Sequence, residues 1–147
     1  MNALCAGEVD YGVMATRNSV AGPVLETGDA VAGISYRVLA EDQIHIHHCL
    51  FVKDASITHF DTIASHIQAL RQCSSHLADD YPDAKWRELE DTAIGARYLH
   101  DGTLPPTTGI LCRKHAGEAF GLYLLRENFE DNPNNITEFM LVELQHD

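Results

Sequence analysis

The chain has 147 residues, of which 45% are hydrophobic, and its formal net charge at pH 7 is −12. This length and composition predict one globular domain over residues 1–147 and exclude a disordered chain. The negative charge argues against a nucleic-acid partner, whose phosphates need a basic surface, and no apolar run approaches the ~20 residues of a membrane span.

The same charge opposes binding of a small anion, which would need local positive potential from an arginine or from clustered backbone N–H groups. No basic-then-apolar signal segment opens the chain. The four cysteines are widely separated and form no Cys-X-X-Cys pair, so we expect reduced, mostly buried thiols in a cytoplasmic protein.

In the first third of the chain, apolar stretches alternate with polar turns. A short strand at Tyr11–Ala15 is followed by a polar turn at Thr16–Ser19, and the small and aliphatic residues of Gly22–Ala32 are compatible with a helix. Tyr36–Ala40 and Gln43–Lys53 alternate as two strands would.

The remainder predicts four strands, at Phe60–Ala64, Lys85–Leu89, Thr108–Cys112 and from Ile136 to Leu144, with Tyr123–Asn128 leading to the last. Ser65 and Gln68 have the spacing of a capping box for the helix after the first of these strands. Two more helices are expected, one from Asp91-Thr92 through Leu99 and a short one around Ala116–Phe120.

Alternating strands and helices imply an α/β domain with a largely parallel sheet, in which ligands lie beyond the carboxyl ends of strands. Three strand–turn–helix junctions would present a hydroxyl and unpaired N–H groups: Asn18-Ser19, Ser65-His66 and Asp91-Thr92. Such residues are most often ordinary helix caps. Together with Thr137, at the start of the last strand, they predict a convergent anion site.

Several segments resemble the prephenate dehydratase family. Asn135-Ile136-Thr137-Glu138-Phe139 is similar to its Asn-X-Thr-Arg-Phe motif, and the stretch from Tyr11 through Asn18-Ser19 is similar to the motif Pro-Ile-Glu-Asn-Ser. Ile46-His47-His48 and the segment Ser65-His66-Ile67-Gln68-Ala69-Leu70 also match the family, with Ile67 in place of proline.

The resemblance implies a two-lobed fold like the type II periplasmic binding proteins, with the site in the cleft and no cofactor. It also implies lyase chemistry on prephenate or a related cyclic carboxylate, in which Thr137 assists the departing hydroxyl. The other site residues it nominates for the anionic or aromatic ligand are Arg17, Asn18, Ser19, Ser65, Thr92, Glu138 and Phe139.

Three differences from the family carry expectations of their own. The family's opening strand–helix–strand unit has no counterpart in this sequence, so the domain is expected to be shortened at its amino terminus. The sheet edge and apolar face left uncovered are expected to pair in a homodimer. No regulatory ACT domain is expected after Leu144. The family's glutamate and arginine are exchanged, as Arg17 and Glu138, which predicts that the two side chains form an ion pair.

Two alternatives to an active enzyme remain at this stage. One is a non-catalytic binding module for a small aromatic or carboxylated ligand, and the other is a remnant that binds nothing. A metal site is not expected, although His45 and His47 share one strand face, because no carboxylate or cysteine spacing completes a ligand set.

Overall fold

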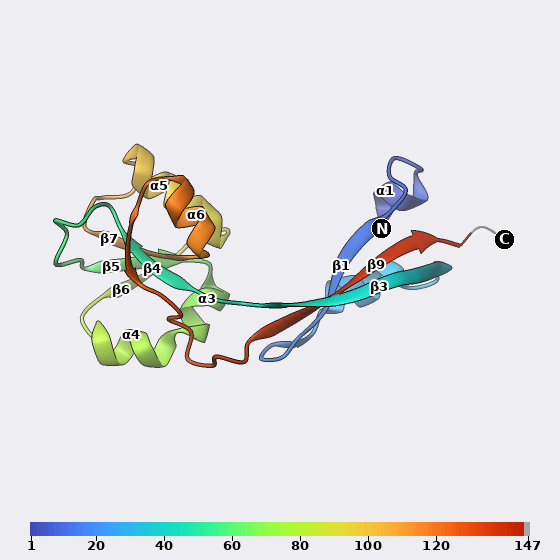
Figure 1. The fold of residues 1–147 in the computed structure, drawn as a ribbon, viewed down its shortest axis with the longest axis horizontal. Helices are drawn as coiled ribbons and strands as arrows, with labels where there is room; N and C mark the ends of the chain where they lie inside the picture. The colour runs from blue at the N-terminus through green and yellow to red at the C-terminus, as the bar shows by residue number, and fades with distance from the viewer. Residues whose placement is uncertain (146–147) are drawn as a thin grey trace. The chain divides into compact units, whose positions relative to one another are not determined.

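The computed structural model describes residues 1–145 and divides the chain into two compact units (Figure 1). Unit 1 consists of residues 1–46 together with the end of the chain from residue 134, and unit 2 of residues 47–133. The two units are described separately below.

Unit 1 is a four-stranded antiparallel sheet in the order β2-β1-β9-β3. The strands are β1 (Gly12–Asn18), β2 (Gly22–Pro23), β3 (Tyr36–His45) and β9 (Ile136–Leu144). Two short helices, α1 (Asn2–Cys5) and α2 (Leu25–Val31), complete the unit. Because the last strand lies between β1 and β3, the chain's end is built into the middle of this sheet.

Helices cover one face of the unit 1 sheet. Met140 and Val142 of β9 are buried against Leu4 of α1, and Val31 of α2 packs on the same cluster. Strand residues alternate between faces, so Phe139 and Leu141 belong to the opposite face.

Unit 2 is a five-stranded mixed sheet in the order β6-β5-β7-β4-β8. Its strands are β4 (Cys49–Val52), β5 (Thr62–Ser65), β6 (Lys85–Glu88), β7 (Thr108–Cys112) and β8 (Tyr123–Arg126). Its helices are α3 (Ile67–Gln72), α4 (Ser74–Asp80), α5 (Thr92–Asp101) and α6 (Lys114–Ala119). Strand β5 is parallel to β6 and β7, whereas β4 is antiparallel to both its neighbours.

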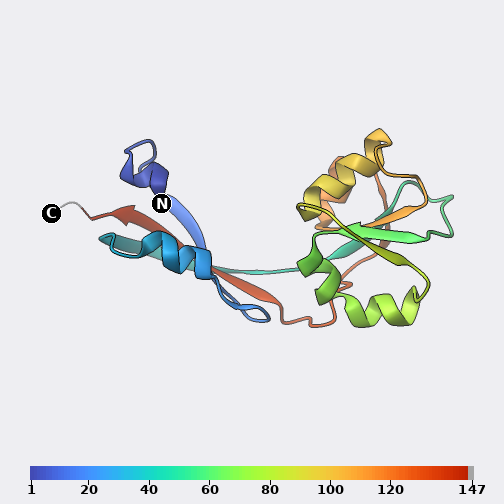
Figure 2. The same cartoon turned by 180° about the vertical axis from the view of Figure 1, so that it is seen from behind.

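Helices lie on both sides of the unit 2 sheet (Figure 2). The buried residues of this unit form two hydrophobic clusters. Ala96 and Leu99 of α5 contribute to one cluster, and Leu70 of α3 and Leu77 of α4 to the other. Gly117 of α6 lies so close to the Phe51 ring that an added Cβ would be 2.4 Å from it, which explains a glycine inside this helix.

The structure confirms the α/β class and most of the strands, with several corrections. Strand β1 runs on through Asn18, and Asn18-Ser19 lead into a hairpin with β2 and not into a helix, because Asn18 pairs with Gly22. Gln43 to His45 belong to β3 and not to the following strand, because β3 pairs with β9 as far as His45–Ile136 and the chain then enters unit 2. The sheets are mixed or antiparallel, whereas a largely parallel sheet was predicted; long-range antiparallel pairing with β9 leaves no trace in the local sequence pattern.

The predicted capping box is also corrected. His66 is the N-cap of α3, and its ring Nδ1 accepts a hydrogen bond from the Gln68 N–H at 3.2 Å. Ser65 is the last residue of β5 and is fully buried, so its hydroxyl donates to the Leu111 carbonyl at 2.7 Å and is unavailable to the helix.

No helix within residues 1–145 is long and apolar enough to cross a membrane. The four cysteines are free thiols, with Cys5 exposed and the other three buried. Burial raises the pKa of Cys73 well above its ordinary value and that of Cys112 to about 12, so both are protonated thiols at neutral pH.

Candidate functional site

The Thr137 hydroxyl is held by the side chain of Asn18 across the β1–β9 ladder. The Asn18 amide Nδ2 donates to Thr137 Oγ1 at 2.9 Å and to the buried Asn135 Oδ1 at 2.8 Å. Because the Thr137 oxygen accepts in this bond, its own hydroxyl hydrogen is directed elsewhere. The geometry therefore presents Thr137 as a donor.

The Asn18 amide is saturated by the protein. Its oxygen accepts from the backbone N–H groups of Val20 and Ala21, each at 2.9 Å, which also fixes which end of the amide faces Thr137. Both amide hydrogens and both oxygen lone pairs are thus in use. This geometry makes Asn18 a residue that orients Thr137 and leaves it no free donor for a substrate.

Ser19 closes the same corner of unit 1. Its hydroxyl donates to the Asn134 carbonyl at 2.9 Å and accepts from the Ile136 N–H at 2.8 Å. Its backbone N–H donates to the Ile136 carbonyl at 2.8 Å. These bonds join the end of β1 to the start of β9 and so fix the position of the backbone next to Thr137.

The predicted approach of Arg17 and Glu138 is confirmed. The two residues are paired across the ladder, and Arg17 Nη1 lies 4.0 Å from Glu138 Oε1. Both side chains are exposed, at 61% and 49%. Since neighbouring residues of a strand point to opposite faces, this pair lies on the face opposite to Thr137 and Asn18, whereas Phe139 shares the face of Thr137.

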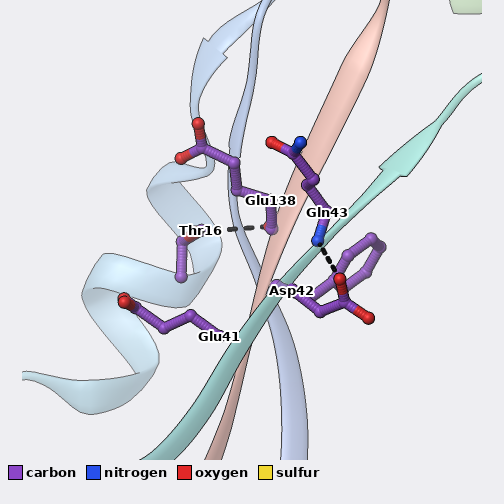
Figure 3. A pocket seen from close by; sticks show the side chains of 6 residues that line it. Thr16, Glu41, Asp42, Gln43 and Glu138 are labelled. Atoms are coloured by element: carbon purple, nitrogen blue, oxygen red, sulfur yellow. Dashed lines mark hydrogen bonds between the residues drawn. The ribbon is translucent and has the colours of Figure 1, made fainter.

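A pocket of about 330 Å³ lies beside Glu138 (Figure 3). It is lined by Thr16, Glu41, Asp42, Gln43, Glu138 and Phe139. Thr16 donates from its hydroxyl to the Glu138 carbonyl at 3.3 Å, and Asp42 accepts from the Gln43 N–H at 2.8 Å. Three carboxylates give this pocket a negative potential, which disfavours a dicarboxylate ligand there.

Ser65 and Thr92 belong to unit 2. Ser65 ends β5 and pairs in parallel with Glu88, the last residue of β6, and Thr92 begins α5. Asp91 caps α5, because its carboxylate accepts from Ala93 N–H at 2.6 Å and Ile94 N–H at 2.9 Å. The predicted helix start is confirmed, and these residues lie at one carboxyl edge of the sheet. The prediction that they share a cleft with Thr137 stays a prediction.

Unit 2 contains a polar network of Glu130, His47, His48 and Gln72, residues to which the sequence patterns assigned no functional role. The Glu130 side chain, 2% exposed, lies with Oε1 2.6 Å from His47 Nδ1 and accepts from the His48 N–H at 2.9 Å. His48 Nε2 lies 2.7 Å from Gln72 Oε1. The sequence signal was weak: a charged residue directly after Phe129 within an acidic loop resembles a solvated turn.

Burial controls the protonation of this network. Burial lowers the pKa of His48, and the bond to Gln72 only partly offsets it, so the ring is neutral at pH 7. Gln72 Oε1 can only accept, which places the His48 proton on Nε2 and leaves its buried Nδ1 without a partner among residues 1–145. Burial opposes ionisation of Glu130, but the hydrogen bonds from His47 and His48 outweigh it and lower its pKa.

Within the described residues, no group of three or more histidine, cysteine, aspartate or glutamate side chains has the geometry to hold a metal ion. The arrangement around Thr137 consists of neutral hydrogen-bonding groups. It can therefore orient a hydroxyl donor, which is a capacity for general-acid or hydrogen-bonding assistance.

Comparison with known proteins identifies relatives of the whole chain. It is 33% identical over 139 residues to a bifunctional chorismate mutase/prephenate dehydratase of Neisseria gonorrhoeae, covering 92% of this chain and 37% of that protein. It is 30% identical over 134 residues to the chloroplastic arogenate dehydratase 5 of Arabidopsis thaliana, covering 90% of this chain and 31% of that protein. The chain thus spans about a third of the length of these curated relatives.

Solved structures agree with this relationship. A prephenate dehydratase from Arthrobacter aurescens, in complex with L-Phe, matches 99% of this chain and 49% of its own with a TM-score of 0.85 and 29% identity. The Staphylococcus aureus enzyme has the same fold, with a TM-score of 0.79 at 20% identity, over 99% of this chain and 53% of its own. A sequence profile described as prephenate dehydratase matches residues 1–147. The chain therefore belongs to the prephenate dehydratase family.

Proposed function

We propose that this chain carries out carbon–oxygen lyase chemistry on prephenate or a related cyclic carboxylate, with Thr137 as the group that assists the departing hydroxyl. Membership of the family supports the reaction class. The observation that carries the assignment of Thr137 is the 2.9 Å bond from the Asn18 amide to its hydroxyl oxygen.

In the proposed step, the bond between the ring and its carboxylate breaks, and its electron pair enters the ring as the carbon–oxygen bond to the hydroxyl breaks. Carbon dioxide and hydroxide depart, and hydroxide leaves as water after taking one proton, which solvent supplies. Thr137 donates a hydrogen bond to the leaving oxygen. The Asn18 amide, which donates to Thr137 Oγ1, stabilises negative charge that develops on that oxygen.

The charged pair beside Thr137 has a different role in this proposal. Arg17 and Glu138 share the opposite sheet face, so we assign Arg17 to the ion pair and not to a substrate carboxylate. The negative charge of Glu138 is likewise directed away from the Thr137 face. Phe139, two residues along the strand from Thr137, is on the correct face to contact the ligand ring.

Incubation with prephenate, followed by phenylpyruvate absorbance in alkali, tests this function. Thr137→Ala should lose most turnover, on the order of 10²-fold, while unfolding at nearly the same temperature as the parent. Thr137→Ser should retain much of it because the hydroxyl remains. Thr103→Ala, which removes an exposed hydroxyl in unit 2, is the matched control. Turnover that survives in Thr137→Ala would assign the hydroxyl step to another group.

A second candidate is a binding module for small aromatic or carboxylated molecules. The Arthrobacter aurescens relative was solved with L-Phe, which supports this ligand class. A thermal-shift series with L-phenylalanine, phenylpyruvate and prephenate distinguishes the two functions. Stabilisation without phenylpyruvate formation favours the binding module, and turnover favours the enzyme.

We also propose that the protein is cytoplasmic and forms a homodimer. Three of the four free cysteines are buried, which is in keeping with a reducing compartment such as the cytoplasm. A homodimer is supported by β3, a ten-residue strand at the end of the unit 1 sheet, because long edge strands are normally paired or covered.

A further inference from the structure

The face of the unit 1 sheet that carries Thr137 also carries an apolar hollow. Its volume is about 310 Å³, and it is lined by Val13, Ala40, Glu41, Asp42, Ile44, Phe139, Met140 and Leu141. One end of the hollow lies next to Thr137, because Ile44 pairs with Thr137 across the β3–β9 ladder. Helices α1 and α2 pack on the opposite face, on the cluster of Met140 and Val142. The hollow therefore has the size and the position to hold the apolar part of a small ligand of Thr137.

Asp42 is the charged residue of the hollow whose side chain belongs to the Thr137 face. It pairs with Phe139 across the ladder, and directly paired residues share a sheet face. Glu41 also lines the hollow, but it pairs with Met140, whose side chain is on the helix-covered face. None of the described residues that line the hollow is a lysine or an arginine. On this face the hollow therefore combines apolar side chains with one carboxylate.

The Asp42 carboxylate can still accept hydrogen bonds from a ligand. Its Oδ1 accepts from the Gln43 N–H at 2.8 Å (Figure 3), whereas its Oδ2 has no hydrogen-bond partner within residues 1–145. The two arginines of unit 1 are paired with other carboxylates, Arg17 with Glu138 and Arg37 with Glu143. A carboxylate beside apolar side chains attracts a ligand cation, such as an ammonium group, and repels a second anion.

We propose that Asp42 binds an ammonium group of the substrate, so that the chain prefers an amino acid such as arogenate to the keto acid prephenate. The inference rests on the function proposed above and names the substrate class of the same site. The substrate ring would lie against Phe139, and its ammonium group would donate to Oδ2 of Asp42, the residue paired with Phe139. Prephenate has a ketone in place of this ammonium group. The same bonds break in both substrates, and arogenate yields phenylalanine.

Turnover of the two acids by the full chain tests the preference, with phenylalanine and phenylpyruvate as the measured products. We expect kcat/KM to be about tenfold higher for arogenate, as one charge-assisted hydrogen bond would give. Asp42→Asn keeps the shape of the side chain and removes its charge. It should lower kcat/KM for arogenate about tenfold, mainly through a higher KM, and should not lower kcat/KM for prephenate.

Asp29→Asn is the matched control for the change in net charge. Asp29 is an exposed residue of α2, which packs on the opposite face of the sheet. Its variant loses the same charge from unit 1 and should keep the parental ratio of the two kcat/KM values. Asp42→Glu retains a carboxylate and should keep the preference for arogenate. Thermal unfolding checks that each variant is folded, and Asp42→Ser replaces Asp42→Asn if that variant does not fold.

A binding measurement separates failure of this inference from failure of the proposed function. L-phenylalanine and phenylpyruvate differ by the same exchange of ammonium for ketone, and their binding needs no catalysis. Titration calorimetry should show about tenfold tighter binding of L-phenylalanine to the parent and no such preference in Asp42→Asn. This result without any turnover would support the role of Asp42 and contradict the enzyme.

Three results would overturn the inference. The first is a parent chain that prefers the keto acid in turnover or in binding. The second is a parental preference for the ammonium ligand in Asp42→Asn, because another group would then recognise it. The third is a parent chain that neither converts arogenate nor binds L-phenylalanine.

Discussion

At the scale of single residues, hydrogen-bond saturation separates the residues that orient from those that can act. Asn18 and Ser19 use their polar atoms within unit 1, whereas the Thr137 oxygen accepts a bond and leaves its hydrogen to be donated elsewhere. The sequence motifs do not distinguish the roles of these three residues. Their hydrogen bonds do, because they make Asn18 and Ser19 orienting residues and Thr137 a donor.

The exposure of Arg17 and Glu138 sets the size of their coupling. A double-mutant cycle combining Arg17→Glu with Glu138→Arg should give a coupling free energy of roughly 0.2–1 kcal/mol, because exposed ion pairs are weak. Urea unfolding of the two single variants, the double variant and the parent measures it. Strict additivity would show that the charge exchange has no energetic meaning.

His48 makes stability depend on pH. Its pKa is lowered in the folded state, so the unfolded chain takes up this proton first, at the ordinary histidine value of about 6.5. The contribution to stability is complete above that pH and is lost as the pH falls below it. The free energy of unfolding should therefore decline from about pH 7 to pH 5.

His48→Gln should flatten this decline, and His59→Gln, at an exposed histidine, should leave it unchanged. Urea unfolding at each pH measures the slope. An identical slope in His48→Gln and the parent would assign the titration to another group.

At the scale of elements, two helices of unit 2 are capped at their N-termini by aspartates, one adjacent to its helix in the sequence and the other distant from it. Asp91 caps α5 from the adjacent position, whereas α4 is capped by Asp131, whose carboxylate accepts from Ser75 N–H at 2.9 Å and His76 N–H at 3.0 Å. This distant cap accompanies the break between α3 and α4 at Cys73, where the sequence predicted one helix.

Asp131→Ala should cost about 1 kcal/mol of cap energy and more from the lost contact between Asp131 Oδ1 and His76 Nδ1, 3.2 Å apart, so we expect a larger effect than for Asp91→Ala. Thermal unfolding of the two variants makes the comparison, with Asp91→Ala as the local-cap control. Equal losses would show that the His76 contact adds nothing.

At the scale of the whole molecule, the prediction concerns the oligomeric state. We expect sedimentation at tens of micromolar to show a dimer, joined through the outer edge of β3, because that edge strand has ten residues. A monomer at this concentration would contradict the prediction.

The sequence by itself determined the family and the positions of most elements. Apolar runs at Thr108–Cys112 and Ile136–Leu144 coincide with β7 and β9, and the Asp91 start and Gly102 stop of α5 are local signals; Gly102 adopts φ +85°, which favours glycine. The exchange of the family's glutamate and arginine, seen as Arg17 and Glu138, could also be identified from the sequence, because it depends only on the residue types at two motif positions.

Tertiary structure alone decided what each polar group does. Ser65 looked like a helix cap, but its burial against the Leu111 carbonyl sends its hydroxyl into the sheet. Glu130 carries no local sign of burial in the sequence, yet it is buried, because His47 and His48, more than 80 positions away in the sequence, form hydrogen bonds with it. The sheet face of each β9 residue likewise follows from strand pairing at long range, which local pattern cannot encode.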